Sequence, residues 1–344
     1  MFHLGPLLES VRARVRPPVV VVLGSPAQAA DVCAGLGDVE IVCYQMDLHQ
    51  AGRLRQQLAE SGSSATIEVS PDLWDLPARF NTAIFPVAAH GERELKLDLL
   101  DQSFHVLAHR GLLISLSEYQ ADQLLPKWHK KVFGKCSELP ASKQGSVFWS
   151  VRDGERPRRR HELVFRAKIA DGPAHAFVSR PGVFGYGELD DGARAMLEVA
   201  DVRPGDRVLD LGCGPGANGI LAVDRAGPTG HVTFVDSNVR ATQLAEHNAK
   251  ENGLANYRCV ASDTMDGLDL ASFDLILANP PYYANSWIAQ MFIEKSKPLL
   301  KPGGRFYLVT KMVNHVAPAM AQVFPESTWE ERRGYHVLRG DADR

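Results

Sequence analysis

Cysteine is scarce in this chain, which has five among its 344 residues. The number is odd and none of the five stands in a C-x-x-C or Cys/His spacing, so the sequence predicts neither a disulfide framework nor a zinc site. No pair of histidines with a nearby carboxylate predicts any other metal site. This cysteine usage is best suited to a reducing, cytoplasmic environment.

Long hydrophobic runs are also missing. The only stretch that resembles a targeting segment is Val19–Leu23, which follows Pro17-Pro18. It is far too short to cross a bilayer, and its surroundings do not have the layout of a signal peptide. We therefore expect neither membrane insertion nor export.

The chain has no large excess of either charge, with 38 Lys and Arg against 41 Asp and Glu and a net charge of -3. This balance excludes a protein that coats polyanions through bulk charge, so any contact with nucleic acid must come from a local patch. Two groups could contact RNA phosphates, although a solvated charge run is an equally good interpretation: Arg156, Arg158, Arg159 and Arg160 in one, and Lys127, Lys130, Lys131 and Lys135 in the other.

The chain has enough hydrophobic residues to fold, at 45% of the total with 23% charged. Its length predicts two domains of roughly 150 to 190 residues each. The arginine-rich run and the Asp171-Gly172-Pro173 breakers that follow it are typical of a connection between domains. We expect a first domain over 1–155, a connection over 156–180 and a second domain over 181–344.

Apolar runs of strand length alternate with longer amphipathic stretches in both halves. This alternation predicts an α/β fold with doubly wound parallel sheets. One helical stretch places Leu189, Ala193, Met196, Leu197 and Ala200 on a single face. The expected strands are Val19–Leu23, Glu40–Tyr44, Thr82–Pro86, Leu112–Leu116, Arg207–Leu211, Val232–Asp236, Phe273–Ala278 and Arg305–Thr310.

The two halves share a spacing that indicates an internal duplication. Three pairs of identical residues are each 193 positions apart: Phe80 with Phe273, Leu107 with Leu300 and Gly111 with Gly304. A constant interval across a strand, a helix and the next strand favours a repeat over chance similarity between two α/β domains.

A glycine-rich loop, Asp210-Leu211-Gly212-Cys213-Gly214-Pro215-Gly216, follows one expected strand and precedes a helix. Glycines there let the backbone turn tightly and approach a ligand closely. The preceding Asp210 would repel a pyrophosphate, so a ligand with a cationic amino-acid end suits the loop better. A tight turn without a ligand remains possible. Cys213 lies in the loop with no histidine partner, so we assign it to packing rather than to nucleophilic chemistry.

Two acids follow the loop at the ends of later apolar runs. Asp236 closes the next strand, where a carboxylate can accept hydrogen bonds from two ribose hydroxyls; it can also cap the following helix. Asp263 comes shortly after Cys259–Ala261, where it could receive an adenine amino group or simply occupy a turn.

The most specific motif is Asn279-Pro280-Pro281-Tyr282, directly after the strand Phe273–Ala278. Ligands bind at the carboxyl ends of strands in open α/β sheets. The Asn279 oxygen and a neighbouring carbonyl can both accept from one NH₂ group, and Tyr282 can lie on a flat ring. Proline fixes this backbone before a substrate arrives. The motif therefore predicts a site for an exocyclic or amide nitrogen.

Together these residues resemble the class I S-adenosylmethionine-dependent methyltransferases. The turn Leu300-Lys301-Pro302-Gly303-Gly304 is also similar to that family's late turn. The resemblance implies an S-adenosyl-L-methionine site and a catalytic set. The implied cofactor residues are Asp210, Gly212, Gly214, Gly216, Asp236, Asp263 and Asn279, and the implied catalytic residues are Asn279, Pro280 and Tyr282.

The segment Arg180-Pro181-Gly182-Val183-Phe184 narrows the resemblance to the "methyltransferase small" group and its bacterial ribosomal RNA guanine-N2 methyltransferases. Those enzymes have two tandem Rossmann-like methyltransferase domains, of which the N-terminal one is degenerate. Here the positions 193 residues before Asn279–Tyr282 hold Pro86-Val87-Ala88-Ala89. The first half also offers only Val22-Leu23-Gly24-Ser25-Pro26 in place of the glycine loop and Gln45 near the place of Asp236.

The resemblance implies transfer of a methyl group to N2 of a guanine in ribosomal RNA, free or in a ribosomal subunit, with the first half as a binding and folding partner. The chain departs from the group at Tyr282, where many members have Phe, and over 283–287. Methylation of adenine N6 or of a protein glutamine, or a noncatalytic role in RNA binding or ribosome assembly, are the alternatives.

Overall fold

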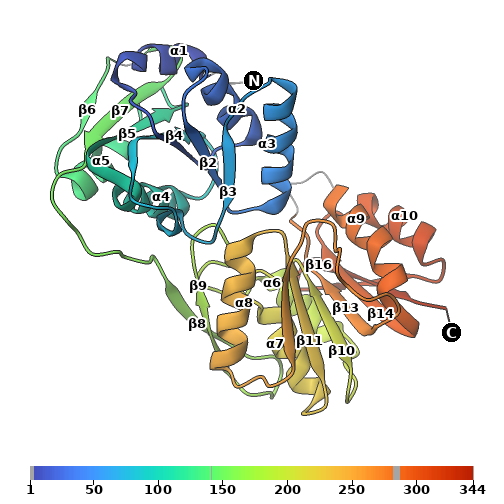
Figure 1. The fold of residues 1–344 in the computed structure, drawn as a ribbon. Coiled ribbons are helices and arrows are strands. Elements are labelled where there is room, and N and C mark those ends of the chain that lie inside the picture. Colours follow the sequence, from blue (N-terminus) through green and yellow to red (C-terminus); the bar gives the residue numbers. More distant parts are fainter. Residues whose placement is uncertain (1–3, 141, 282–286, 344) are drawn as a thin grey trace. The chain divides into compact units, whose positions relative to one another are not determined.

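The computed structural model describes residues 4–140, 142–281 and 287–343. The chain divides into two compact units, Met1–His161 and Glu162–Arg344 (Figure 1). Each unit is a Rossmann-like α/β domain with its own seven-stranded sheet. The α/β class and the tandem arrangement predicted from the sequence are confirmed.

The sheet of the first unit has the order β3-β2-β1-β4-β5-β7-β6, with five parallel strands followed by two antiparallel ones. Its strands are β1 (Val19–Val22), β2 (Ile41–Gln45), β3 (Thr66–Val69), β4 (Phe80–Val87), β5 (Leu107–Ser117), β6 (Ser137–Glu138) and β7 (Ser146–Val151). Its helices are α1 (Gly5–Glu9), α2 (Pro26–Leu36), α3 (Leu48–Glu60), α4 (Arg93–Val106) and α5 (Leu125–Phe133).

The second unit repeats this topology in the order β12-β11-β10-β13-β14-β16-β15. Its strands are β10 (Arg207–Leu211), β11 (His231–Asp236), β12 (Tyr257–Ala261), β13 (Phe273–Ala278), β14 (Leu300–Thr310), β15 (Thr328–Arg332) and β16 (Tyr335–Asp341). Its helices are α6 (Asp191–Val199), α7 (Ala217–Ala226), α8 (Val239–Glu251), α9 (Trp287–Ser296) and α10 (Val313–Val323). A separate hairpin, β8 (Leu163–Ala167) with β9 (His175–Ser179), precedes them.

Successive side chains of a strand point to opposite faces, which is why the core of each unit has two layers. In β10, Val208 packs in one cluster with residues of α6, α7 and α8, whereas Leu209 packs in another with residues of α9 and α10. Met196, Leu197 and Ala200 of the helical face predicted from the sequence lie in the first of these clusters, with Leu189 packed against it just before α6 begins. Burial on both faces explains why the central strands are almost continuously apolar.

The duplication is visible in the strand register. In the first unit the pairing of β4 with β5 shifts between Phe80 and Thr82, and in the second the pairing of β13 with β14 shifts between Phe273 and Leu275. The glycines 193 residues apart meet the same obstacle: a Cβ on Gly111 would lie 3.0 Å from the Phe80 carbonyl oxygen, and one on Gly304 would lie 3.1 Å from that of Phe273.

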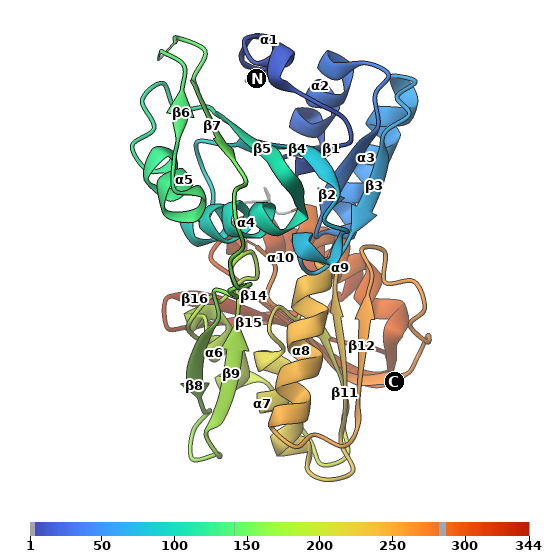
Figure 2. The same cartoon turned by 60° about the vertical axis from the view of Figure 1, so that its left-hand side comes forward.

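The segment over 156–180, which we expected to be a connection, has two different parts. The unit boundary falls after His161. The hairpin β8–β9 then lies beside α8 of the second unit (Figure 2), where Val178 donates to Asn248 Oδ1 at 2.8 Å and Asn248 Nδ2 donates back to the Val178 carbonyl at 2.9 Å.

The arginine-rich run before the hairpin packs on the first unit. Arg156 forms an ion pair with the buried Asp101 at 3.0 Å, and Arg160 forms one with Asp72 at 3.6 Å. Arg158 donates to the Trp74 carbonyl at 3.2 Å and lies over the Trp74 ring. Three of the four arginines that we considered for RNA contact are therefore engaged within the protein.

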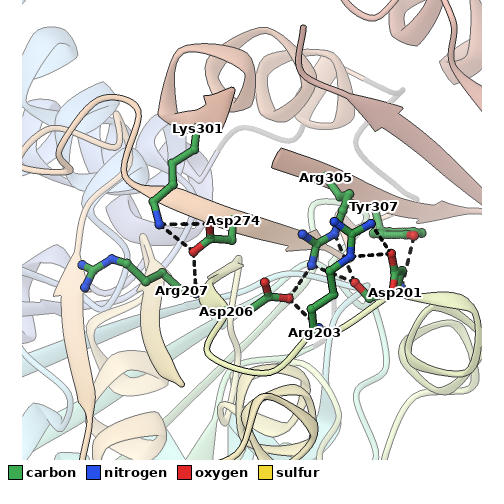
Figure 3. A network of polar contacts seen from close by, with 8 residues as sticks. All are labelled: Asp201, Arg203, Asp206, Arg207, Asp274, Lys301, Arg305 and Tyr307. Carbon is green, nitrogen blue, oxygen red and sulfur yellow. Dashed lines mark hydrogen bonds and ion pairs between the residues drawn. The ribbon is translucent and has the colours of Figure 1, made fainter. Parts of the chain in front are cut away.

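A polar network closes the amino end of the second sheet, opposite the carboxyl ends of the strands (Figure 3). Arg305 and Asp206 form a buried ion pair, and Arg305 also donates to the Asp201 carbonyl at 2.9 and 3.1 Å. Nearby, Asp274 accepts from Lys301 at 2.7 Å and from the backbone N–H of Arg207 at 2.9 Å. These contacts tie the starts of β10 and β13 to β14.

Candidate active site

A pocket opens at the carboxyl ends of β10 and β13 in the second unit, with about 360 Å³ of empty space, part of which is open to solvent. It lies where parallel α/β sheets bind ligands. Its lining comes from the glycine loop, the start of α7, the segment before α6 and the end of β13: Phe184, Glu188, Asp190, Gly212, Cys213, Gly214, Pro215, Asn218 and Asn279 are among the contributors.

The loop between β10 and α7 has five residues, 212–216, and needs its glycines. Gly216, at the cap of α7, has φ +83°, and a Cβ there would lie 3.0 Å from Ala245. Further along, a Cβ on Gly219 would lie 2.5 Å from the Phe234 ring, so α7 can approach the sheet closely only because this residue has no side chain.

Asp210 lies beneath this loop rather than among the pocket-lining side chains. It is completely buried and accepts the backbone N–H of Gly219 at 2.8 Å. Burial raises its pKa to about 7, against the opposing effect of the hydrogen bonds from Gly219 and Asn218. The carboxyl group thus supports the first turn of α7 and places a titratable group directly below the pocket.

Asp236 fastens the loop to the neighbouring strand. Its carboxylate accepts the N–H groups of Gly214 and Asn238, both at 2.9 Å. The cap of α8, which we had considered for Asp236, is Asn238, whose side chain accepts from Arg240. Asp263 lies two residues beyond β12 and is half-buried. Among the cofactor residues expected from the sequence, the pocket lining includes Gly212, Gly214 and Asn279. Gly216 lies at the cap of α7, Asp236 ends β11, and Asp263 lies beyond the end of β12.

Asn279 directly follows β13 and is only 9% exposed. Its side-chain amide Nδ2 donates to Asp190 Oδ2 at 2.9 Å. Pro280 is buried next to it. Tyr282, the expected stacking ring, lies outside the described residues.

The segment 180–184 forms a wall of the pocket because it is held at the start of α8. Arg240 donates to the Pro181 carbonyl at 2.5 Å, and Asn238 donates to that of Gly182 at 2.7 Å. Val183 is buried against α8, which leaves the half-exposed Phe184 at the pocket.

Three polar lining residues were missed from the sequence: Glu188, Asp190 and Asn218. Asp190 could have been found as a helix cap, since it precedes an amphipathic stretch and its side chain accepts the N–H of Ala193 at 3.0 Å. Its contact with Asn279 joins residues 89 positions apart, which no local pattern indicates.

Cys213 lines the pocket but has the properties of a packing residue. Its thiol is buried, and burial raises its pKa well above the ordinary range. A thiol that stays protonated is a poor nucleophile. The expectation that Cys213 has no chemical role stays a prediction, and this environment supports it.

Comparisons with known proteins agree with this geometry. The family model "Methyltransferase small domain" matches residues 174–339. The uncharacterized protein YbxB of Bacillus subtilis (strain 168) is 32% identical over 212 residues, which cover 59% of this chain and 95% of YbxB. The chain belongs to the methyltransferase small family.

Two further similarities concern proteins whose names state a substrate. Ribosomal RNA small subunit methyltransferase C of Pseudomonas entomophila (strain L48) is 33% identical over 61% of this chain, a match that spans 64% of that protein's length. The T. thermophilus 16S rRNA N2 G1207 methyltransferase (RsmC), solved with AdoMet and guanosine, has a TM-score of 0.77 at 21% identity, over 98% of this chain and 92% of its own. The second similarity shows the same fold across both units.

The cofactor of this methyltransferase is S-adenosyl-L-methionine, and the residues of the pocket fit it. The glycine loop leaves room that any side chain would fill: a Cβ on Gly214 would lie 3.4 Å from the Phe184 carbonyl oxygen. Asn218 Oδ1 is buried and accepts no hydrogen bond from the described residues, so it offers an acceptor for an ammonium group. Asp236 stands where ribose hydroxyls would be held.

The corresponding crevice of the first unit is filled by its own side chains. Strand register places Val21 at the position of Asp210 and Gln45 at that of Asp236. The loop between β1 and α2 has three residues, 23–25, instead of five. Pro86, the counterpart of Asn279, lies over this loop, 3.2 Å from where a Cβ of Gly24 would be.

Polar contacts complete this closure. Glu118 accepts from Gln28 Nε2 at 3.1 Å and from the Ala89 N–H at 2.7 Å. Lys96 donates to the Ala88 carbonyl at 2.7 Å, at the position where the second unit has its Asn-Pro-Pro-Tyr motif. The first unit is therefore a degenerate copy, as the sequence predicted.

Neither a membrane span nor a metal centre is found in the part of the chain that the structure describes. No helix there combines the length and apolar character needed to cross a bilayer. No group of three or more His, Cys, Asp or Glu side chains is arranged there to hold a metal ion.

Proposed function

We propose that this protein transfers a methyl group from S-adenosyl-L-methionine to the exocyclic N2 amine of a guanine in ribosomal RNA. The observation that carries the proposal is Asn279, held at the pocket by Asp190 on one side of its carboxamide. The substrate class is taken from the relatives named as ribosomal RNA small subunit methyltransferases.

The Asn279 carboxamide accounts for the choice of an amine as acceptor. An aryl amine shares its lone pair with the ring, and hydrogen bonds from its two hydrogens to Asn279 Oδ1 and a nearby carbonyl draw the nitrogen toward a tetrahedral arrangement. The lone pair would then be available to the methyl group that the bound cofactor supplies: a nitrogen–carbon bond would form, the cofactor would leave as its neutral thioether, and the methylated nitrogen would release one proton to solvent. Alignment and exclusion of water are the main tasks of such a site, so no acid-base pair is needed.

A base must leave its helix before it can enter such a pocket. Phe184 is half-exposed at the pocket and offers an aromatic surface for an unstacked base. Tyr282 is the second aromatic residue proposed for this role. The proposal therefore favours a loop or an accessible strand of RNA over an intact duplex.

The first unit offers a basic row for the RNA backbone. Four lysines are exposed on and just after α5, and among the described residues none forms an ion pair with an acid: Lys127, Lys130, Lys131 and Lys135. Two of the four arginines of 156–160, Arg156 and Arg160, are paired with acids of the protein, and Arg158 is held on Trp74, so we assign phosphate contact to the lysine row.

The test is transfer of a radiolabelled methyl group to ribosomal RNA, isolated ribosomal subunits, DNA and release factor, followed by nucleoside analysis. Label in N2-methylguanosine that is lost with Asn279→Ala supports the proposal. Label in N6-methyladenosine or in protein would contradict guanine N2 as the target but would still support methylation of an NH₂ group. Cofactor binding without any transfer would favour the noncatalytic alternative.

A further inference from the structure

We propose that Asp190 is a positioning residue that fixes the orientation of the Asn279 carboxamide, and thereby decides that the site accepts hydrogens from an amine. The inference rests on the proposed function for its substrate. Its structural part concerns only these two side chains.

The orientation follows from the chemistry of the two groups. A carboxylate can only accept hydrogen bonds, and an amide has one donating and one accepting end. The contact of 2.9 Å between Asn279 Nδ2 and Asp190 Oδ2 therefore directs the amide oxygen to the other side of the carboxamide. Rotated by half a turn, Asn279 would place its oxygen against the carboxylate and present a donor to the substrate amine, which also donates.

Asp190 is itself held in place by the helix that follows it. It is the N-cap of α6, and its Oδ2 accepts the N–H of Ala193 at 3.0 Å. The same oxygen accepts from Asn279. α6 packs in the apolar core through Ala195, Met196 and Leu197, so a rigid element fixes the acceptor. The helix cap and the active-site contact thus depend on one atom.

This shared atom allows the two roles to be separated by substitution. Asp190→Ser keeps an efficient N-cap, but the shorter side chain cannot cap the helix and reach Asn279 together. Asp190→Asn keeps an oxygen that the Ala193 N–H selects, and that oxygen can also accept from Asn279. Asp191→Ser is the matched control, since Asp191 is exposed and belongs to the same first turn of α6.

The first measurement does not depend on a substrate. The side-chain amide signals of Asn279, assigned in ¹⁵N-labelled protein by their loss in Asn279→Ala, are expected to move in Asp190→Ser and to stay near their wild-type positions in Asp190→Asn and Asp191→Ser. Unchanged signals in Asp190→Ser would overturn the proposal, whatever the protein methylates.

The second measurement uses the methyl-transfer assay. Asp190→Ser is expected to lower kcat by roughly 10- to 100-fold, as misplacement of a positioning contact does, with KM for RNA and the cofactor Kd changed less than about 3-fold. Asp190→Asn should restore most of the rate. Equal losses in both variants, or loss of cofactor binding in Asp190→Ser, would show that the residue acts through its charge or through the fold instead.

A wild-type protein that transfers no methyl group to any RNA would contradict the proposed function. The amide signals would still decide whether Asp190 orients Asn279. The two failures are therefore distinguishable.

Discussion

Asp210 shows how strongly burial in the fold can shift the pKa of a single side chain. Burial raises its pKa from the ordinary 3.8 to about 7. Between these two values the folded protein keeps a proton that the unfolded chain has lost, so this group makes the free energy of unfolding fall as the pH rises from about 4 to 7. The site thus gives up stability to keep a carboxyl group under the glycine loop.

Replacing this carboxyl group by an amide makes the loss of stability measurable. In the absence of cofactor, Asp210→Asn should equal the wild type in stability near pH 4 and exceed it by on the order of 4 kcal/mol at pH 8, because the amide has no charge to desolvate. Urea unfolding at both pH values measures the difference. Parallel pH profiles for the two proteins would contradict the raised pKa.

Substitution of Gly219 tests how closely α7 packs on the sheet beneath the same loop. Its Cβ would lie 2.5 Å from the Phe234 ring and 2.6 Å from Val232. Gly219→Ala should therefore destabilise the protein by about 1–3 kcal/mol through overpacking, despite the higher helix propensity of alanine. Gly52→Ala is the control, because nothing lies within 4 Å of a Cβ there. Equal stability of the two variants in thermal unfolding would argue against a close helix–sheet contact.

Sequence reasoning at this scale found the residues whose neighbours are local. The glycine loop and Asn279 were predicted because each belongs to a short motif of consecutive residues. Asp190 was not assigned to the site, because its meaning depends on a contact with the end of a strand far along the chain. Asp210 was identified, but its place below the pocket follows from the direction of alternate side chains in β10.

The strands, like the site residues, were predicted where the sequence carries a strong local signal. The eight strands expected from apolar runs are all present, with ends that differ by a few residues. The other eight of the sixteen strands that the structure describes were not predicted. The strands β3, β6, β8, β9, β12 and β15 are short or partly exposed and lack the apolar signal of buried strands. The strands β7 and β16 are largely buried, but polar residues interrupt their apolar runs. The interval of 193 residues predicted the duplication, and the structure adds that both sheets depart from regular pairing at the same place.

The network at the amino end of the second sheet should be important for stability but not for chemistry. Asp206→Ala would leave Arg305 buried without its ionic partner, at an expected loss of about 3–5 kcal/mol in the free energy of unfolding. Chemical denaturation measures this loss. Because the network lies opposite the pocket, cofactor Kd at a temperature where the variant is folded should be unchanged; a large rise would contradict that separation.

At the scale of the whole molecule, the two units should differ in ligand binding. Calorimetric titration is expected to give one S-adenosylmethionine per chain. Asp236→Ala should abolish this binding, whereas Gln45→Ala in the first unit should leave it unchanged. Two equivalents per chain, or a loss with Gln45→Ala, would contradict the closed crevice described for the first unit.

RNA binding should depend on the lysine row of α5. Lys127→Glu with Lys131→Glu is expected to weaken RNA binding and to reduce the dependence of log Kd on log salt by about 1 for each phosphate that the protein no longer neutralises. Lys250→Glu with Lys295→Glu, at two exposed lysines of α8 and α9, controls for the same change in net charge. Equal effects of the row and the control would indicate that the first unit does not touch the RNA backbone.

The shortened loop of the first unit also bears on its evolution. Two residues are missing between β1 and α2, and a proline covers the remaining space. Restoring a second cofactor site would require an insertion in this loop together with replacements at Pro86, Gln45 and Val21. Each change alone would disturb a packed interior without creating a cofactor-binding site. The loss is thus effectively irreversible by single substitutions, and the freed unit could specialise without returning to its former chemistry.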